Sequence, residues 1–174
     1  LNLGNDSRVL VVGAGETNTT MCKFLYKHGF KNFTIVNRTY ENALKLANQV
    51  KGEAIALKDL QAFDKGFDLL VTCTGSEQPI FTKKVYDNLL LGEDNKKTIV
   101  DLAIPTDVDA AIVNDYSVHY IEINGLKSIS QKNISEREKE IHKCEEHIDN
   151  KLEEFKSAIQ ERKIELAMRE VPKK

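Results

Sequence analysis

The chain has 174 residues, of which 41% are hydrophobic, and its formal net charge is −2. A chain of this length and composition can form one domain of ordinary size with some residues left over, while the near-neutral charge excludes a general attraction to nucleic acid or to an anionic membrane. No apolar run is long enough to span a membrane, and no signal peptide is recognisable. The odd number of cysteines, three far apart in the sequence, argues against a disulfide framework, so we expect a cytoplasmic protein without a membrane partner.

Residues up to about 125 alternate short apolar runs with helical patterns. The run at residues 9–12 is continuous, which is typical of a strand that is buried on both faces of a parallel sheet. Further strands are predicted at residues 33–36, 54–57, 67–73, 98–102 and 119–123. Because strands that alternate with helices are joined by right-handed crossovers, the pattern predicts an α/β domain with a Rossmann-type, doubly wound parallel sheet.

Two helices are predicted beside the first strands. The first extends from about Thr17 to His28, and Gly29 is expected to end it in a left-handed cap. Its apolar side is formed by Met21, Cys22 and Leu25. The second helix follows the second strand, and its predicted apolar face carries Tyr40, Ala43, Leu44, Ala47 and Val50.

Residues from about 128 onward are highly charged, lack glycine and contain one proline near the end. Apolar residues recur there every seven positions on two adjacent rows, at Ile134, Ile141, Ile148 and Phe155 and at Leu152, Ile159 and Leu166. The spacing predicts a long amphipathic α-helix over 128–174, separate from a Rossmann domain over 1–127. The small domain alone cannot cover such a helix, so we expect it to pack on another domain or chain; a solvated, partly frayed helix is the alternative.

A glycine-rich loop directly follows the first predicted strand and begins the first helix. Gly13 allows the tight turn, Gly15 lets the backbone approach a pyrophosphate, and the start of the helix offers free N–H groups and a positive dipole end. Asn18 holds the third glycine position, which implies wider packing of the helix or a shifted loop but does not block phosphate binding. The predicted cofactor contacts here are Gly13, Ala14, Gly15, Glu16, Thr17 and Asn18. A glycine turn without a ligand is the alternative.

The second strand ends in Asn37, Arg38 and Thr39, at the position where NAD and NADP are distinguished. NAD sites usually place a carboxylate here, which would repel the additional phosphate of NADP. The neutral Asn37, the cationic Arg38 and the hydroxyl of Thr39 suit that phosphate, because a guanidinium forms charge-assisted hydrogen bonds to it. Thr39 is also expected to cap the next helix. We therefore predict NADPH as the cofactor; a surface arginine and a simple helix cap are the alternative.

Small and hydroxyl-bearing residues follow the fourth predicted strand, across the switch point from the first. Thr74, Gly75 and Ser76 are expected to let the nicotinamide half of the cofactor lie close to the backbone, although an ordinary strand-to-loop transition explains the segment equally well. Residues 101–105 end the fifth strand at the same edge of the sheet, and Leu102 and Ile104 are expected to wall the nicotinamide pocket.

No residue of the chain is predicted to act in covalent or metal catalysis. Cys73 has no histidine nearby in the sequence and is interpreted as a buried structural thiol. His142, Cys144 and His147 are spaced so that they point in different directions around a helix, so no metal site is expected.

Several of these segments resemble glutamyl-tRNA reductase. The likeness is carried by Gly13-Ala14-Gly15-Glu16-Thr17, by Asn37-Arg38-Thr39-Tyr40-Glu41-Asn42-Ala43, by Thr74-Gly75-Ser76 with Pro79-Ile80, and by Asp101-Leu102-Ala103-Ile104-Pro105-Thr106-Asp107-Val108-Asp109. The last segment is the most specific, since generic Rossmann domains rarely carry it. Residues 133–155 resemble the start of the family's long spinal helix. Two residues depart from the family's pattern, namely Asn18, which is usually smaller or apolar, and Thr106, where an arginine is common.

The resemblance implies the NADPH-binding domain, with part of the spinal helix, of an enzyme that reduces the glutamyl group of glutamyl-tRNA to glutamate-1-semialdehyde at the entry to tetrapyrrole (porphyrin and heme) biosynthesis. In this family a cysteine of another domain forms a thioester, which hydride from NADPH then reduces. Cys22, Cys73 and Cys144 match none of that cysteine's motif, and the chain begins at Leu1 rather than Met, so we expect an excerpt that is inactive alone. Implied partners are glutamyl-tRNA, a second subunit in a homodimer and the aminomutase that acts next.

Two other interpretations stay open. The glycine loop and the Asn-Arg-Thr corner also occur in the cofactor domain of shikimate-dehydrogenase-like NADP oxidoreductases, although a long striped helix at the end fits them poorly. The chain is alternatively an NADPH-binding interaction module that assembles through its long helix without hydride chemistry.

Overall fold

The computed structural model describes residues 3–169, apart from the side chains of residues 124, 126–140, 142, 146, 165, 167 and 169. By its internal contacts the chain divides into two compact units, Leu1–Leu126 and Lys127–Lys174. The first unit contains the sheet and both hydrophobic clusters, and the described part of the second is helical.

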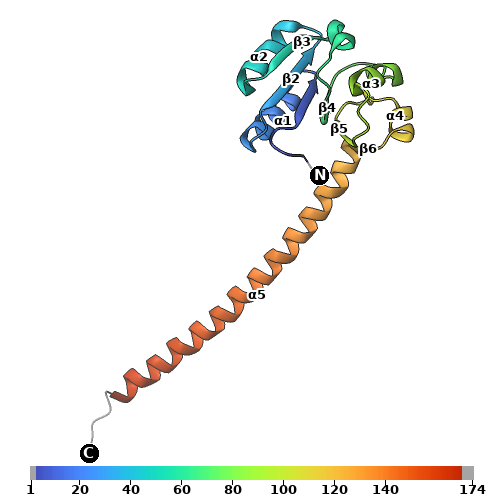
Figure 1. Cartoon of the computed structure of the whole chain (residues 1–174). Helices are drawn as coiled ribbons and strands as arrows, with labels where there is room; N and C mark the ends of the chain where they lie inside the picture. The colour runs from blue at the N-terminus through green and yellow to red at the C-terminus, as the bar shows by residue number, and fades with distance from the viewer. Residues whose placement is uncertain (1–2, 170–174) are drawn as a thin grey trace, which may run out of the picture. The chain divides into compact units, whose positions relative to one another are not determined.

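Six parallel strands form one sheet in the first unit (Figure 1). The strands are β1 (Arg8–Val12), β2 (Asn32–Asn37), β3 (Glu53–Ala56), β4 (Leu69–Thr72), β5 (Lys97–Asp101) and β6 (Val118–Glu122). The connecting helices are α1 (Glu16–Lys27), α2 (Tyr40–Val50), the 3-10 helix η1 (Leu57–Ala62), α3 (Lys83–Leu90) and α4 (Ala110–Asp115). The strand order β3-β2-β1-β4-β5-β6 is that of a Rossmann fold, which confirms the predicted α/β class.

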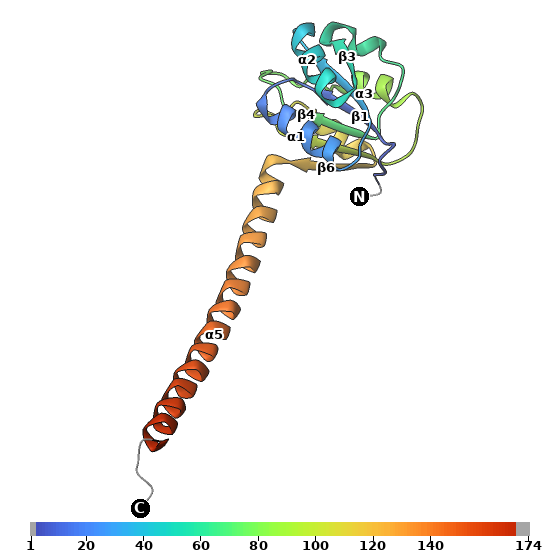
Figure 2. The ribbon, with the colours of Figure 1, turned by 90° about the vertical axis from the view of Figure 1, so that its left-hand side faces the viewer.

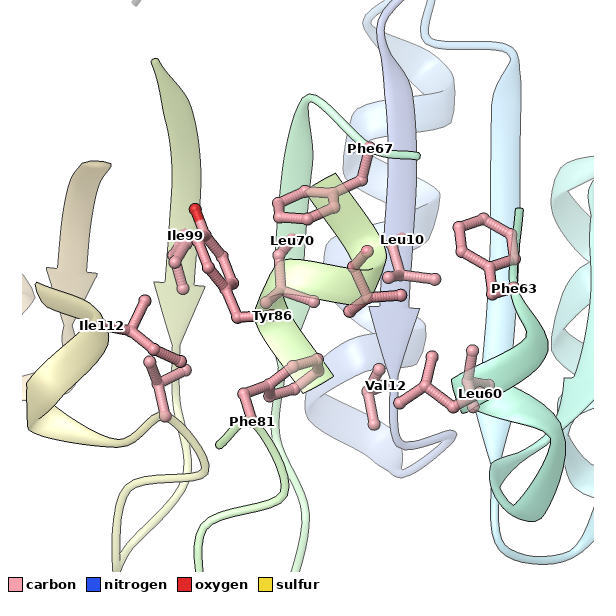
Figure 3. Packing of buried hydrophobic residues seen from close by; sticks show 13 residues of the cluster. Leu10, Val12, Leu60, Phe63, Phe67, Leu70, Phe81, Tyr86, Ile99 and Ile112 are labelled. Atoms are coloured by element: carbon pink, nitrogen blue, oxygen red, sulfur yellow. The ribbon is translucent and has the colours of Figure 1, made fainter. Parts of the chain in front are cut away.

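Residues of β1 point alternately to the two faces of the sheet, and both faces are covered. Val9 and Val11 belong to one hydrophobic cluster, which includes residues of α1 and α2. Leu10 and Val12 belong to the other, which includes residues of η1, α3 and α4 (Figure 3). Because side chains pack against β1 on both faces of the sheet, the position of the loop that follows β1 is well defined.

The predicted apolar side and end of α1 are confirmed. Cys22 is fully buried, and Met21 and Leu25 pack against the same cluster. Gly29 adopts a φ of +97°, and its N–H donates to the carbonyl of Tyr26, as expected for a left-handed cap.

The predicted apolar face of α2 is partly wrong. The buried residues are Ala43, Leu46, Ala47 and Val50. These positions follow the i, i+3, i+4, i+7 spacing of one helix face, and Leu44 lies outside it, so its side chain is exposed. Tyr40, also exposed, lines a shallow hollow with Arg38 instead of packing in the core.

Four charged side chains meet at the amino ends of β1, β4 and β5. The Arg8 guanidinium donates to Asp68 Oδ1 at 2.8 Å and to Glu93 Oε2 at 2.7 Å, and the buried Lys97 ammonium donates to Glu93 Oε2 at 2.5 Å. The hydrogen bonds from Arg8 lower the pKa of Asp68 to about 2, and those from Arg8 and Lys97 lower the pKa of Glu93 to about 2. The network ties together strand starts that lie far apart in the sequence.

The helix α5 (Ile123–Arg169) has 47 residues and follows β6 directly, so it begins a few residues earlier than predicted (Figure 2). Side chains of the two predicted apolar rows are exposed at Ile141, Ile148, Leu152, Phe155, Ile159 and Leu166. The side chain of Ile134 lies outside the described residues. Among the helices that the structure describes, none is both long enough and apolar enough to cross a membrane.

Candidate functional site

A groove of about 430 Å³ lies at the carboxyl edge of the sheet, between the loops after β1, β2 and β4. The order of the strands reverses between β1 and β4, and in open α/β sheets ligands bind at this point because the neighbouring loops diverge there. Eight of the predicted contact residues line the groove, namely Gly13, Ala14, Gly15, Asn37, Arg38, Thr74, Gly75 and Ser76. The other six do not, namely Glu16, Thr17, Asn18, Thr39, Leu102 and Ile104.

Two glycines give the first loop its shape. Gly13 has a φ of +99°, and a Cβ atom there would lie 2.4 Å from the carbonyl oxygen of Cys73, so only glycine fits. Gly15 faces open space, since a Cβ atom would meet nothing within 4 Å. Gly15 is also the N-cap of α1, and among the residues that the structure describes no side chain forms a cap hydrogen bond with this helix. The first N–H groups of α1 are therefore available to an anionic ligand.

Asn18 does not line the groove but holds the glycine loop on the side that faces the protein interior. The side chain is fully buried, and its Nδ2 donates to the carbonyls of Val12 and Gly13, at 2.8 Å each. Its Oδ1 has no hydrogen-bond partner within the described part of the chain. Asn18 thus replaces the close packing of a glycine with two hydrogen bonds that hold the end of β1.

Asn37 links the glycine loop to the corner after β2. Its Oδ1 accepts from the N–H of Ala14 at 3.2 Å, and its Nδ2 donates to the carbonyl of Thr39 at 2.9 Å. A carboxylate at this position could accept the first hydrogen bond but could not donate the second. Thr39 occupies the N-cap position of α2, but its side chain makes no cap hydrogen bond, so that expectation is corrected.

Arg38 lies at the junction of two hollows. It lines the groove, and with Tyr40, Leu57 and Lys58 it lines a shallower hollow next to α2 and η1. Among the described residues, no carboxylate pairs with its exposed guanidinium. An unpaired arginine beside an open hollow is suited to bind a phosphate group.

The loop after β5 does not wall the groove as predicted. The buried Asp101 carboxylate accepts from the N–H groups of Ala103 and Val108, at 3.0 Å each, and folds the loop back on itself. Burial raises the pKa of Asp101, while these hydrogen bonds act in the opposite direction. As a result Leu102 is half-buried beside β4, and Ile104 is 74% exposed.

Four further residues line the groove, namely Val12, Leu57, Cys73 and Ile80. Val12, Leu57 and Cys73 each end a predicted strand, which indicates such a position, whereas no signal in the sequence indicates it for Ile80. Cys73 is half-buried, and burial raises the pKa of its thiol, which does not favour a thiolate at neutral pH. Burial also raises the pKa of Cys22, to about 12. Among the residues whose side chains are described, no cluster could hold a metal ion.

Residues 2–129 match a family model described as Shikimate / quinate 5-dehydrogenase, which covers the whole sheet and the groove. The chain belongs to this family. Its resemblance to glutamyl-tRNA reductase is confirmed by curated relatives with that name. The reductase of Methanopyrus kandleri is 33% identical over 165 residues, and that of a Sulfurihydrogenibium strain is 30% identical over 150 residues. These alignments cover 92% and 86% of this chain but only 41% and 34% of the relatives.

Solved structures of glutamyl-tRNA reductases support the same resemblance. The chain superimposes on glutamyl-tRNA reductase from Methanopyrus kandleri with a TM-score of 0.71 and 31% identity, covering 95% of this chain and 47% of that one. The nucleotide-binding domain of the Thermoplasma volcanium reductase shares the fold, with a TM-score of 0.58 at 23% identity over 77% of this chain and 88% of that one. The chain therefore spans less than half the length of the full reductases that it matches.

Proposed function

We propose that this chain is the NADPH-binding part of a glutamyl-tRNA reductase and holds the hydride donor of that enzyme. The observation that carries the proposal is the groove, where the glycine loop, the uncapped start of α1 and the unpaired Arg38 guanidinium lie together. The family and the Rossmann sheet support a nicotinamide cofactor, and Arg38 supports NADPH rather than NADH.

The residues that are present fit such a dinucleotide. The open space at Gly15 and the free N–H groups of α1 suit a pyrophosphate. Arg38 and Lys58 line the adjoining hollow together with Asp59, and the two cations suit the 2′-phosphate. The loop at residues 74–76, on the other side of β1, is left for the nicotinamide half.

When bound, NADPH would supply the hydride that reduces the glutamyl group of glutamyl-tRNA to an aldehyde. The residues of this chain would bind and orient the donor. We propose that the cysteine that forms the thioester and the residues that hold the tRNA belong to other parts of the protein. In support, Cys22, Cys73 and Cys144 match none of that cysteine's motif, and burial raises the pKa of the Cys22 and Cys73 thiols. A homodimer and the aminomutase that acts next remain proposed partners.

The other interpretations are less well supported. The family model takes its name from shikimate and quinate dehydrogenases, but the curated relatives are glutamyl-tRNA reductases, and their likeness extends into α5. The same relatives disfavour an interaction module without hydride chemistry.

The proposed cofactor preference is tested by titrating NADPH and NADH against the wild-type chain and the Arg38→Ala variant. Removing a charge-assisted contact to the 2′-phosphate should weaken NADPH binding by about 10- to 100-fold and change NADH binding little. The matched control is Lys27→Ala, which removes one positive charge in the last turn of α1, about 18 Å from the glycine loop. Equal losses for NADPH and NADH would contradict the assignment of Arg38 to the phosphate.

A further inference from the structure

Asp107 lies outside the groove but reaches the loop that forms one of its walls. Its side chain is fully buried. Its Oδ2 accepts from the Thr72 hydroxyl at 2.5 Å and from the N–H of Thr74 at 3.0 Å, and its Oδ1 accepts from the Thr74 hydroxyl at 2.6 Å. Three donors from the end of β4 therefore converge on one carboxylate.

The backbone on both sides of this carboxylate is held in place. The N–H of Phe81 donates to the carbonyl of Asp107 at 2.9 Å, and the N–H of Asp109 donates to the carbonyl of Phe81 at 3.0 Å. The N–H of Val108 donates to the buried carboxylate of Asp101. These contacts hold Asp107 in place without a ligand. The hydrogen bonds of Phe81 form a short parallel β-bridge between Phe81 and Val108, which also holds the far end of the loop that follows β4.

The contacts of Asp107 also set the orientation of the Thr74 hydroxyl. The Thr74 hydroxyl uses its single proton in the hydrogen bond to Asp107 Oδ1. The lone pairs of that hydroxyl are then free to accept, and the N–H of Ser76 lies 3.2 Å from it. In this way Asp107 holds the backbone of Thr74 directly and that of Ser76 through the Thr74 hydroxyl, and both residues line the groove.

We propose that Asp107 is a positioning residue for the nicotinamide half of the cofactor and acts through Thr74. The inference rests on the proposed function, because it assigns the loop at residues 74–76 to that half. Arg38 and the glycine loop, which are proposed to hold the adenosine half and the pyrophosphate, make no described contact with Asp107. Loss of Asp107 should therefore affect one end of the ligand and spare the other.

The test compares two ligands on the full chain. NADPH carries both halves, and adenosine 2′,5′-bisphosphate carries only the adenosine half with its phosphates. Asp107→Ala should raise the Kd of NADPH at least tenfold and change that of the bisphosphate less than twofold, with Asp107→Asn between wild type and Asp107→Ala. Thr74→Val, which replaces the hydroxyl with a methyl group, should likewise raise the Kd of NADPH and not that of the bisphosphate. If the Asp107 variants do not fold, this variant tests the inference. The matched control is Asp109→Asn, which alters the N-cap of α4 two residues away and should leave both constants unchanged.

A selective loss of NADPH binding supports the inference. Equal losses for the two ligands, or no loss for either in a folded variant, would overturn it, since a merely structural role affects both ends alike. If the wild-type chain binds neither NADPH nor NADH, the proposed function itself fails, and this result is distinguishable because it precedes any substitution.

Discussion

Gly13 and Gly15 are separated by one alanine, yet a methyl group would have opposite consequences at the two positions. At Gly13 it would lie 2.4 Å from the Cys73 carbonyl oxygen on a backbone with a φ of +99°. Gly13→Ala should therefore lower the free energy of unfolding by about 1–3 kcal/mol or more, from backbone strain and the steric clash. Denaturant unfolding monitored by circular dichroism measures the loss.

Gly15→Ala is the matched control for stability. The residue has a φ of −76° and open space around it, so the variant should unfold like wild type. Its NADPH affinity should nevertheless fall about tenfold, because the methyl group would keep the pyrophosphate from the backbone. A stable Gly13→Ala variant, or a Gly15→Ala variant with unchanged affinity, would show that the loop was assigned incorrectly.

Individual side chains were predictable where position alone determines their role. Arg38 follows the end of β2, and it lines the groove as that position in a Rossmann sheet predicts. The role of Asn18 was not predictable, because its two acceptors become reachable only once α1 packs behind β1. Thr39 has the right residue type at the right position for a cap, but its side chain does not make the bond.

The strand starts are joined by the network of Arg8, Asp68, Glu93 and Lys97, which predicts sensitivity to acid. The pKa values of Asp68 and Glu93 are about 2, below their ordinary values, so the folded state binds these protons less readily than the unfolded chain. Their stabilisation is complete above the ordinary pKa values and is lost as the pH falls from about 4.5 to about 2. Thermal unfolding measured across this interval should show a falling midpoint.

Glu93→Gln tests the same network at neutral pH. It leaves the Lys97 ammonium, only 1% exposed, without its closest partner, and should lower the free energy of unfolding by about 1–3 kcal/mol. It should also flatten the pH dependence. The matched control is Glu53→Gln, whose pair with Lys65 is well exposed and should contribute less than about 1 kcal/mol. Similar effects of the two substitutions would argue against a special role for the network.

Secondary-structure elements were predictable in kind and order, because apolar periodicity reports directly on burial. The predicted strand at residues 67–73 is observed as β4 over Leu69–Thr72, and the N–H groups of the flanking Asp68 and Cys73 still donate to the carbonyls of Arg8 and Val12. The loop after β5 lies at the predicted edge of the sheet, but the Asp101 carboxylate folds it back on itself, and neither Leu102 nor Ile104 lines the groove. Carboxylate contacts of this kind leave no periodic trace in the sequence.

The chain as a whole is predicted to tolerate removal of its second unit. Both hydrophobic clusters and all residues that line the groove belong to Leu1–Leu126. A chain that ends at Leu126 should therefore unfold cooperatively, with a midpoint within about 4 °C of the full chain. It should also bind NADPH with a Kd within twofold of the full chain. Loss of cooperative unfolding or of NADPH binding would show that α5 is required for the fold or the site.

The Rossmann class, the glycine loop, the position of Arg38 and the resemblance to glutamyl-tRNA reductase were predictable before the fold was known. Each depends on neighbours in the chain, on periodicity or on a short motif, which are local properties. The folded chain was needed to see that Asp107 holds Thr74, that Asn37 joins two loops and that Arg8 pairs with Glu93, 85 residues away. These contacts could not be predicted because hydrogen bonds and ion pairs depend on distances of a few ångströms between residues that the sheet brings together.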